Sequence, residues 1–183
     1  MIDSREASEA LSDINDIAQR VRQSTIYHLA SLMLITWGAL VCVGNLISFF
    51  WPFAATRAWL AIYAAGIAGS FAISALSYPR TRIRTVDFRM LLAFVLFVAF
   101  GIFTSSWLGH FTARQMGTFW TIYFMLFYTI AGLWFGFAFV VIGAGIIVLT
   151  LVGYFLVGAW FELWMALVNG GGLVLGGLWM RRN

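Results

Sequence analysis

Long apolar stretches fill the chain from residue 25 to residue 180, and few charged residues interrupt them. Six of these stretches have about the 20 apolar residues that a helix needs to cross a hydrocarbon layer ~30 Å thick. A soluble domain has about 25% charged residues, whereas this chain has 10% charged and 62% hydrophobic residues. The sequence therefore predicts an all-α, polytopic integral membrane protein whose surface faces mainly the lipid bilayer.

Prolines and polar breaks divide the apolar part of the chain. Proline disfavours helical geometry in the residue before it, so we expect the first two spans to end before Pro52 and at Pro79. Residues 25–183 form a predicted six-span domain of three helical hairpins, with spans at about 25–50, 58–78, 88–108, 117–135, 137–157 and 161–180.

The boundary between the fourth and fifth spans has no charged residue to mark it. No Asp, Glu, Arg or Lys lies between Arg114 and Glu162, and a single helix of that length would be ~70 Å long. This exceeds twice the membrane thickness, so the chain has to turn once. The segment from Gly132 to Gly136 is the predicted turn.

Arginine placement predicts the orientation of the spans. All eleven basic residues are arginines, and nine lie in the N-terminal segment, the 78–89 loop or the C-terminal tail. The positive-inside rule places these three segments in the cytoplasm, and we expect a bacterial inner membrane. The arginines lie beside apolar spans and do not cluster on one face of a helix, which argues against a nucleic-acid partner. The topological arginines of the loop and tail are Arg80, Arg82, Arg84, Arg89, Arg181 and Arg182.

Residues 1–24 are predicted to form an amphipathic helix before the first span. Leu11, Ile14, Ala18 and Val21 recur at three- and four-residue steps, with charged residues largely elsewhere. Two uses are open for this helix. It could pack on the membrane surface or the protein's own loops, or it could dock a soluble or membrane partner.

An internal repeat relates spans one and two to spans five and six. At an offset of 105 residues, Gly38 aligns with Gly143 and Trp59 with Trp164. The two halves enter the membrane from the same side, so the repeat is parallel rather than inverted. Spans three and four would be a more diverged third hairpin.

The glycine and aromatic landmarks of these hairpins carry a family resemblance. The segments from Trp37 to Leu40 and from Phe50 to Phe53, followed by Gly66 and Gly69, resemble the HdeD-like family of six-span bacterial membrane proteins. The resemblance implies a three-hairpin fold and a link to acid-stress resistance, and it supplies no catalytic residues.

Few polar side chains are predicted inside the spans. Asn45 and Asn169 are the amides there, and Thr150 occupies the repeat position of Asn45. These three could line a small polar site, or they could bond across helices. The spans contain no ionisable residue at mid-depth, which argues against ion-coupled transport.

At the outer side, Glu162 and Arg57 occupy equivalent repeat positions, and Arg114 lies in the remaining outer loop. An ion pair of Glu162 with one arginine could clamp the outer ends of the hairpins. The alternative is a set of separate, solvated charges.

Small-residue pairs offer helix-packing faces. Gly132 with Gly136, and Gly172 with Gly176, permit close helix approach within the chain or between two copies. Tryptophans near the span ends are typical of interfacial anchors; they are Trp51, Trp59, Trp107, Trp160, Trp164 and Trp179.

Neither a cofactor nor a metal is predicted. His28 and His110 are expected at opposite membrane faces and so could not share a haem. Cys42 is the only cysteine, which excludes an intrachain disulfide and a multi-cysteine metal site.

These features favour a non-enzymatic bacterial membrane protein with a structural, complex-subunit or stress-related role. Its partners would bind the N-terminal helix or the glycine faces, and a homo-oligomer is one form of this hypothesis. The alternative is a small channel or carrier for a neutral or lipophilic solute. An enzyme is the least favoured class, because the sequence has no nucleophile, acid–base or metal motif.

Overall fold

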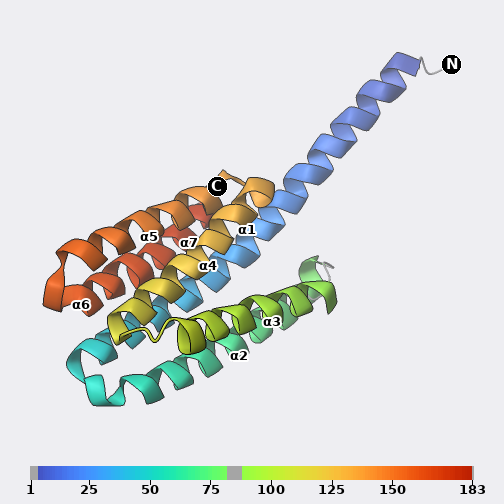
Figure 1. Ribbon diagram of the computed structural model, residues 1–183. Coiled ribbons are helices and arrows are strands. Elements are labelled where there is room, and N and C mark those ends of the chain that lie inside the picture. The colour runs from blue at the N-terminus through green and yellow to red at the C-terminus, as the bar shows by residue number, and fades with distance from the viewer. Residues whose placement is uncertain (1–3, 82–87, 183) are drawn as a thin grey trace.

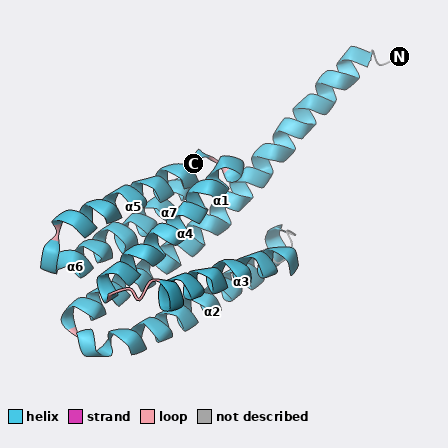
Figure 2. Cartoon of the chain, viewed as in Figure 1, coloured by secondary structure: helices cyan, strands magenta, loops and turns pink. Residues whose placement is uncertain are grey.

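The computed structural model describes residues 4–81 and 88–182, and these residues form helices and short connections without any strand (Figures 1 and 2). In chain order the elements are α1 (Ser4–Phe50), η1 (Pro52–Ala54), α2 (Ala55–Thr81), α3 (Phe88–Phe103), the π-helical η2 (Thr104–Leu108), α4 (Ala113–Phe135), α5 (Phe137–Leu156), η3 (Gly158–Trp160), α6 (Phe161–Met165), the π-helical η4 (Ala166–Gly171) and α7 (Gly172–Arg182).

Six helical stretches are long and apolar enough to cross a membrane, which confirms the predicted class of multi-pass helical membrane protein. The six stretches are Ser24–Phe50, Pro52–Ser77, Leu91–Leu108, Ala113–Phe135, Phe137–Leu156 and Gly158–Arg182. The grouping of these spans into three hairpins stays a prediction.

The helix α1 is continuous across the expected boundary between residues 24 and 25. Its first part extends away from the bundle as a rod, and only its second part is the apolar stretch Ser24–Phe50 (Figure 1). The first glycine of the chain is Gly38 and the first proline is Pro52. Since no helix breaker lies near residue 24, the N-terminal segment and the first span join into one helix.

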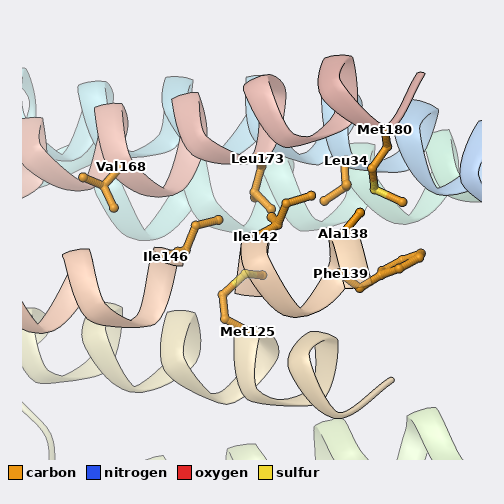
Figure 3. Close-up of a cluster of buried hydrophobic side chains, with 9 residues drawn as sticks. All are labelled: Leu34, Met125, Ala138, Phe139, Ile142, Ile146, Val168, Leu173 and Met180. Atoms are coloured by element: carbon orange, nitrogen blue, oxygen red, sulfur yellow. The ribbon is translucent and has the colours of Figure 1, made fainter. Parts of the chain in front are cut away.

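Four spans make up the packed centre of the molecule, here called the four-helix unit: α1, α4, α5 and the sixth span, which consists of α6, η4 and α7. The sixth span packs against α1 and α5, and α5 packs against α4. Figure 3 shows the buried apolar cluster inside this unit; it consists of Leu34, Met125, Ala138, Phe139, Ile142, Ile146, Val168, Leu173 and Met180.

The remaining two spans, α2 and α3, form the outer pair at the lower edge of the view in Figure 1. The helix α2 rests on α1, where Trp37 Nε1 donates a hydrogen bond to Ser70 Oγ at 3.0 Å. The helix α3 rests on α4, where Tyr123 Oη donates to the Phe97 carbonyl at 2.9 Å and the two rings stack. Aromatic side chains therefore join the outer pair to the four-helix unit.

Glycine and proline act differently at two helix ends. The chain turns between α4 and α5 at Gly136, inside the predicted 132–136 segment, and the φ angle of 138° there is one that L side chains rarely adopt. By contrast, α2 continues past Pro79 to Thr81, where we expected it to end. A proline in the last turn removes one hydrogen bond, to the Ala75 carbonyl, without stopping the helix.

Candidate functional site

A hydrogen bond between two buried polar side chains links the sixth span to α4. Asn169 Nδ2 donates to Thr121 Oγ1 at 2.9 Å. Asn169 lies in η4, and a π-helical turn contains an extra residue that changes the direction of its side chains; such turns are frequent at functional positions. Here Asn169 reaches α4 while the adjacent Gly170 contacts α1.

The contact at Gly170 sets the level of Asn45 in the bundle. A Cβ atom added to Gly170 would lie only 2.6 Å from Cys42 Cα, so α1 and η4 meet through their backbones. Asn45 follows Cys42 by less than one helical turn and is itself buried. It therefore lies within about a turn of the level of Asn169.

A second contact sets the level of Thr150 on α5. A Cβ atom added to Gly172 would lie 3.3 Å from Ile146 Cγ1. Thr150 comes one turn after Ile146, and α5 runs antiparallel to the sixth span, so Thr150 lies near the level of Asn169. The structure thus brings the three predicted polar residues to a similar depth on three different spans.

The hydrogen bonds of this polar layer (Asn45, Thr121, Thr150 and Asn169) are not equivalent. Asn45 Nδ2 donates at 2.8 Å to the Val41 carbonyl of its own helix. The Thr150 hydroxyl is fully buried and has no hydrogen-bond partner among the described residues. The layer therefore combines one bond between spans, one bond within a helix and one free hydroxyl.

The chemistry available to this layer is that of neutral amides and hydroxyls. These groups donate and accept hydrogen bonds without holding a charge at neutral pH. The layer can bind a neutral polar group or join helices, and it has no group that could serve as a general acid, a general base or an activated nucleophile.

Arg114 forms a second polar cluster, at the opposite end of α5 from Gly136. Its guanidinium donates to the carbonyls of Gly153 at 3.1 Å, Tyr154 at 2.5 Å and Gly158 at 3.2 Å, and it lies 4.7 Å from the ring centroid of Phe161. The last carbonyls of a helix have no partner within the helix, and a cation there matches the helix dipole. Arg114 therefore caps α5 from the first turn of α4.

The suggested outer ion pair of Glu162 stays a prediction. Glu162 is half-buried next to Phe161 and close enough to Arg114 for their charges to interact. The Arg114 guanidinium instead donates hydrogen bonds to the backbone carbonyls of Gly153, Tyr154 and Gly158. Arg57 is exposed at the start of α2.

The two predicted glycine pairs serve packing within the chain. Gly172 and Gly176 both face α5, and a Cβ atom on Gly176 would lie 2.8 Å from Ile142 Cδ1. One on Gly132 would lie 2.7 Å from the Val140 amide nitrogen, next to the turn at Gly136. A role for these glycines in a dimer stays a prediction.

The topological arginines lie largely at the edges of the described regions. Arg82 and Arg84 fall outside the described residues, whereas Arg80 and Arg89 belong to α2 and α3. The last two arginines end α7, where both are exposed. The cytoplasmic location of the termini and of the 78–89 loop stays a prediction.

Two of the six predicted anchor tryptophans, Trp59 and Trp164, bond to the preceding span through the indole nitrogen. Trp59 Nε1 donates to Ser48 Oγ at 3.0 Å, and Trp164 Nε1 donates to the Leu149 carbonyl at 2.8 Å. Each indole thus ties its span to the preceding one. The other four are exposed, as expected of residues at a lipid interface: Trp51, Trp107, Trp160 and Trp179.

The described regions contain no cluster of side chains that could hold a metal ion. His28 and His110 are both exposed, and no three His, Cys, Asp or Glu residues gather there in a way that could hold a metal ion. Cys42 lies at the contact with Gly170 and is a free thiol. The expectation that no cofactor is bound stays a prediction.

Sequence reasoning missed Thr121 and the capping role of Arg114. A stripe of small and polar residues on α4 was available as a signal for the first, because Thr118, Thr121, Met125 and Gly132 recur at helical spacing and are all buried. For Arg114 the sequence offers no local signal, because its partners lie 39 to 44 residues away. Comparison with known proteins adds no further assignment: no family model, curated protein or solved structure matches the chain.

Proposed function

We propose that the protein is a non-enzymatic subunit or structural component of a membrane assembly, and that the first part of α1 is its docking element. The observation that carries this proposal is the continuation of α1 beyond the bundle (Figure 1). Residues 4–23 add ~30 Å of helix to the apolar span. A helix that projects in this way is available to a partner.

The sequence of the projecting helix favours a partner with an apolar groove. Leu11, Ile14 and Ala18 share one face, and the acidic side chains lie largely elsewhere. Amphipathic helices bind grooves through residues at such three- and four-residue steps. The acidic polar face disfavours a helix that lies on anionic lipid, because lipid-binding helices are rich in Lys and Arg.

The wider assignment to a bacterial inner-membrane protein similar to the HdeD-like family, with a stress-related role, is part of this proposal. The contacts of Trp59 and Trp164 support the repeat on which it depends. The two tryptophans are aligned at the offset of 105 residues, and each bonds to the span before it. A glycine also lies against each indole, Gly44 for Trp59 and Gly153 for Trp164, but these two glycines do not align at that offset, so the repeat rests on the tryptophans and their bonds.

The docking proposal is tested by substituting the two faces of the projecting helix. The full-length protein is purified natively in a mild detergent, and co-purifying proteins are identified. We expect Leu11→Glu with Ile14→Glu to lose a partner that the unaltered protein retains. Asp13→Asn with Asp16→Asn is the matched control and keeps it. If the apolar-face variant retains the same proteins, or if the unaltered protein retains none, the proposal is wrong.

A second candidate is a pathway for a neutral polar solute, favoured by the unpartnered Thr150 hydroxyl in the polar layer. Its test is solute flux into liposomes that contain the purified protein. Asn45→Leu and Asn169→Leu would reduce flux of a neutral solute such as glycerol, whereas Thr36→Val, which changes a hydroxyl bonded within α1, would not. Equal flux in all four proteins, or none, removes this candidate.

A further inference from the structure

An open apolar groove of about 310 Å³ runs between α5 and α7. The groove is lined by Val141, Gly145 and Leu149 of α5 and by Gly172, Leu175 and Trp179 of α7, among others. No side chain reaches the space beside Gly145, because a Cβ atom added there would have no neighbour within 4 Å. Glycines therefore form its floor and larger apolar side chains its walls.

The length of the groove corresponds to a lipid chain within one leaflet. From Val141 to Leu149 the helix rises ~12 Å, and half of a hydrocarbon core ~30 Å thick is ~15 Å. One end of the groove is at the bundle end where α5 begins and α7 finishes, since Ala138 and Met180 belong to the same buried cluster (Figure 3). The other end is at the level of Val168, which lies near the middle of the sixth span, Gly158–Arg182.

Positive groups gather at the membrane-surface end of the groove. The groove-lining residues of α7 follow the steps Gly172, Leu175 and Trp179, and Arg182 continues this face by one more turn. Beside it, α5 begins at Phe137 without any side-chain cap on its first amide groups. The amide of Phe139 donates to the Gly136 carbonyl at 3.2 Å, which leaves those of Phe137 and Ala138 as the first amides of α5. Amides at a helix N-terminus and an arginine both attract a phosphate.

We propose that this groove binds one acyl chain of an anionic phospholipid, whose phosphate is held by Arg182 and the first amides of α5. Basic pockets between membrane helices bind anionic headgroups in this way. A second copy of the chain fits the groove less well. A symmetric pair with its two α7 helices side by side would place two Arg182 guanidinium groups and two positive helix ends near each other.

Native mass spectrometry of the full-length protein tests the proposal, with phosphatidylglycerol and phosphatidylcholine added in equal amounts. We expect the unaltered protein to retain phosphatidylglycerol in preference. Gly145→Leu fills the groove and lowers this retention at least fivefold. Arg182→Gln lowers the preference for phosphatidylglycerol about fivefold, the factor that corresponds to ~1 kcal/mol for one basic residue at an anionic surface.

Matched variants separate lipid binding from general effects. Gly117→Leu also adds a side chain where a Cβ atom has no neighbour within 4 Å, and Arg57→Gln removes an exposed arginine from the start of α2. Both should retain lipid as the unaltered protein does. Three results would each overturn the proposal. The unaltered protein could retain the two lipids equally, or Gly145→Leu and Gly117→Leu could retain lipid equally. The third result is a dimer that Gly145→Leu abolishes while lipid retention stays the same.

Discussion

The four-helix unit and the outer pair both contain glycines at helix contacts, but direct backbone contact at a glycine between spans is found in the four-helix unit, whereas Gly66 and Gly101 of the outer pair face indole rings. In the four-helix unit, Gly38 and Gly170 allow the backbones of α1 and the sixth span to meet directly. In the outer pair, Gly66 and Gly101 each receive an indole ring from a neighbouring span. The first arrangement joins helices through backbone contact, and the second joins them through a large side chain.

This difference predicts how each region tolerates change. A backbone atom cannot move without shifting its helix, whereas the far end of a side chain can adopt another rotamer. The four-helix unit should therefore be rigid and sensitive to added volume, and the outer pair should adapt. Lipid, which is as apolar as the helices, adds no hydrophobic driving force between them, so van der Waals packing and hydrogen bonds between helices determine stability in both regions.

The largest effect is expected at Gly170. Gly170→Ala would place its Cβ atom 2.6 Å from Cys42 Cα, and we expect it to lower the free energy of unfolding by about 2–3 kcal/mol. Reversible unfolding in mixed detergent micelles measures this. Gly171→Ala is the control, because its nearest neighbour, Leu167 Cδ1, is 3.8 Å away. Equal loss at the two positions would contradict the backbone contact.

Removal of the α5 cap comes next. Arg114→Gln would leave two or three carbonyls without a charged donor, and we expect a loss of about 2 kcal/mol. Arg57→Gln, at an exposed arginine, should change stability by less than about 0.5 kcal/mol. Thermal unfolding of both variants in the same detergent provides the comparison. An Arg114→Gln protein as stable as Arg57→Gln would show that the cap contributes little.

In the outer pair, we expect Gly66→Ala to lower stability by a smaller amount, which depends on the side chain at position 37. Gly66→Ala would bring a methyl group 2.5 Å from Trp37 Cη2 and should cost about 1 kcal/mol. The same substitution in a Trp37→Phe background should cost less, because the shorter ring leaves space. A double-mutant cycle measures the coupling. Additive effects would mean that this contact resembles the one at Gly170.

The smallest effect is expected when a threonine hydroxyl is removed, and it should depend on whether that hydroxyl bonds to another span or within its own helix. Thr121→Val removes the acceptor of the bond from Asn169 across the unit and should lower stability by about 0.6 kcal/mol, the average for bonds between membrane helices. Thr36→Val removes a hydroxyl that donates to Leu32 in its own helix. We expect that variant to lose less. Identical unfolding curves for both variants would rule out an energetic role for the bond between spans.

Hydropathy made the spanning helices predictable, because a helix in lipid has to be apolar over its whole length. The turn near Gly136 was predictable for the same reason, since one uncharged helix could not fit the membrane. The continuity of α1 was not, because a change from polar to apolar sequence marks a change of solvent and not a helix end. Likewise, Pro79 was expected to end the second span, but α2 continues past it to Thr81.

In the candidate sites, the polar residues could be predicted from the sequence, but their hydrogen-bond partners could not. Asn45, Thr150 and Asn169 were identifiable from the sequence as polar residues in apolar runs that could line one site. Their partners were not identifiable, because hydrogen bonds depend on rotation about each helix axis. The π-helical η4 changes that rotation by one residue. The glycine pairs were ambiguous for a related reason, since spacing alone does not say which neighbour fills the gap.

The turn at Gly136 also bears on how the protein enters its membrane. Only this residue separates α4 from α5, so neither span has a loop that could hold it in water while the other inserts. No charge near the turn selects a side of the membrane for it. We therefore expect the two helices to insert together as a pair, in a direction that the segments inserted before them determine.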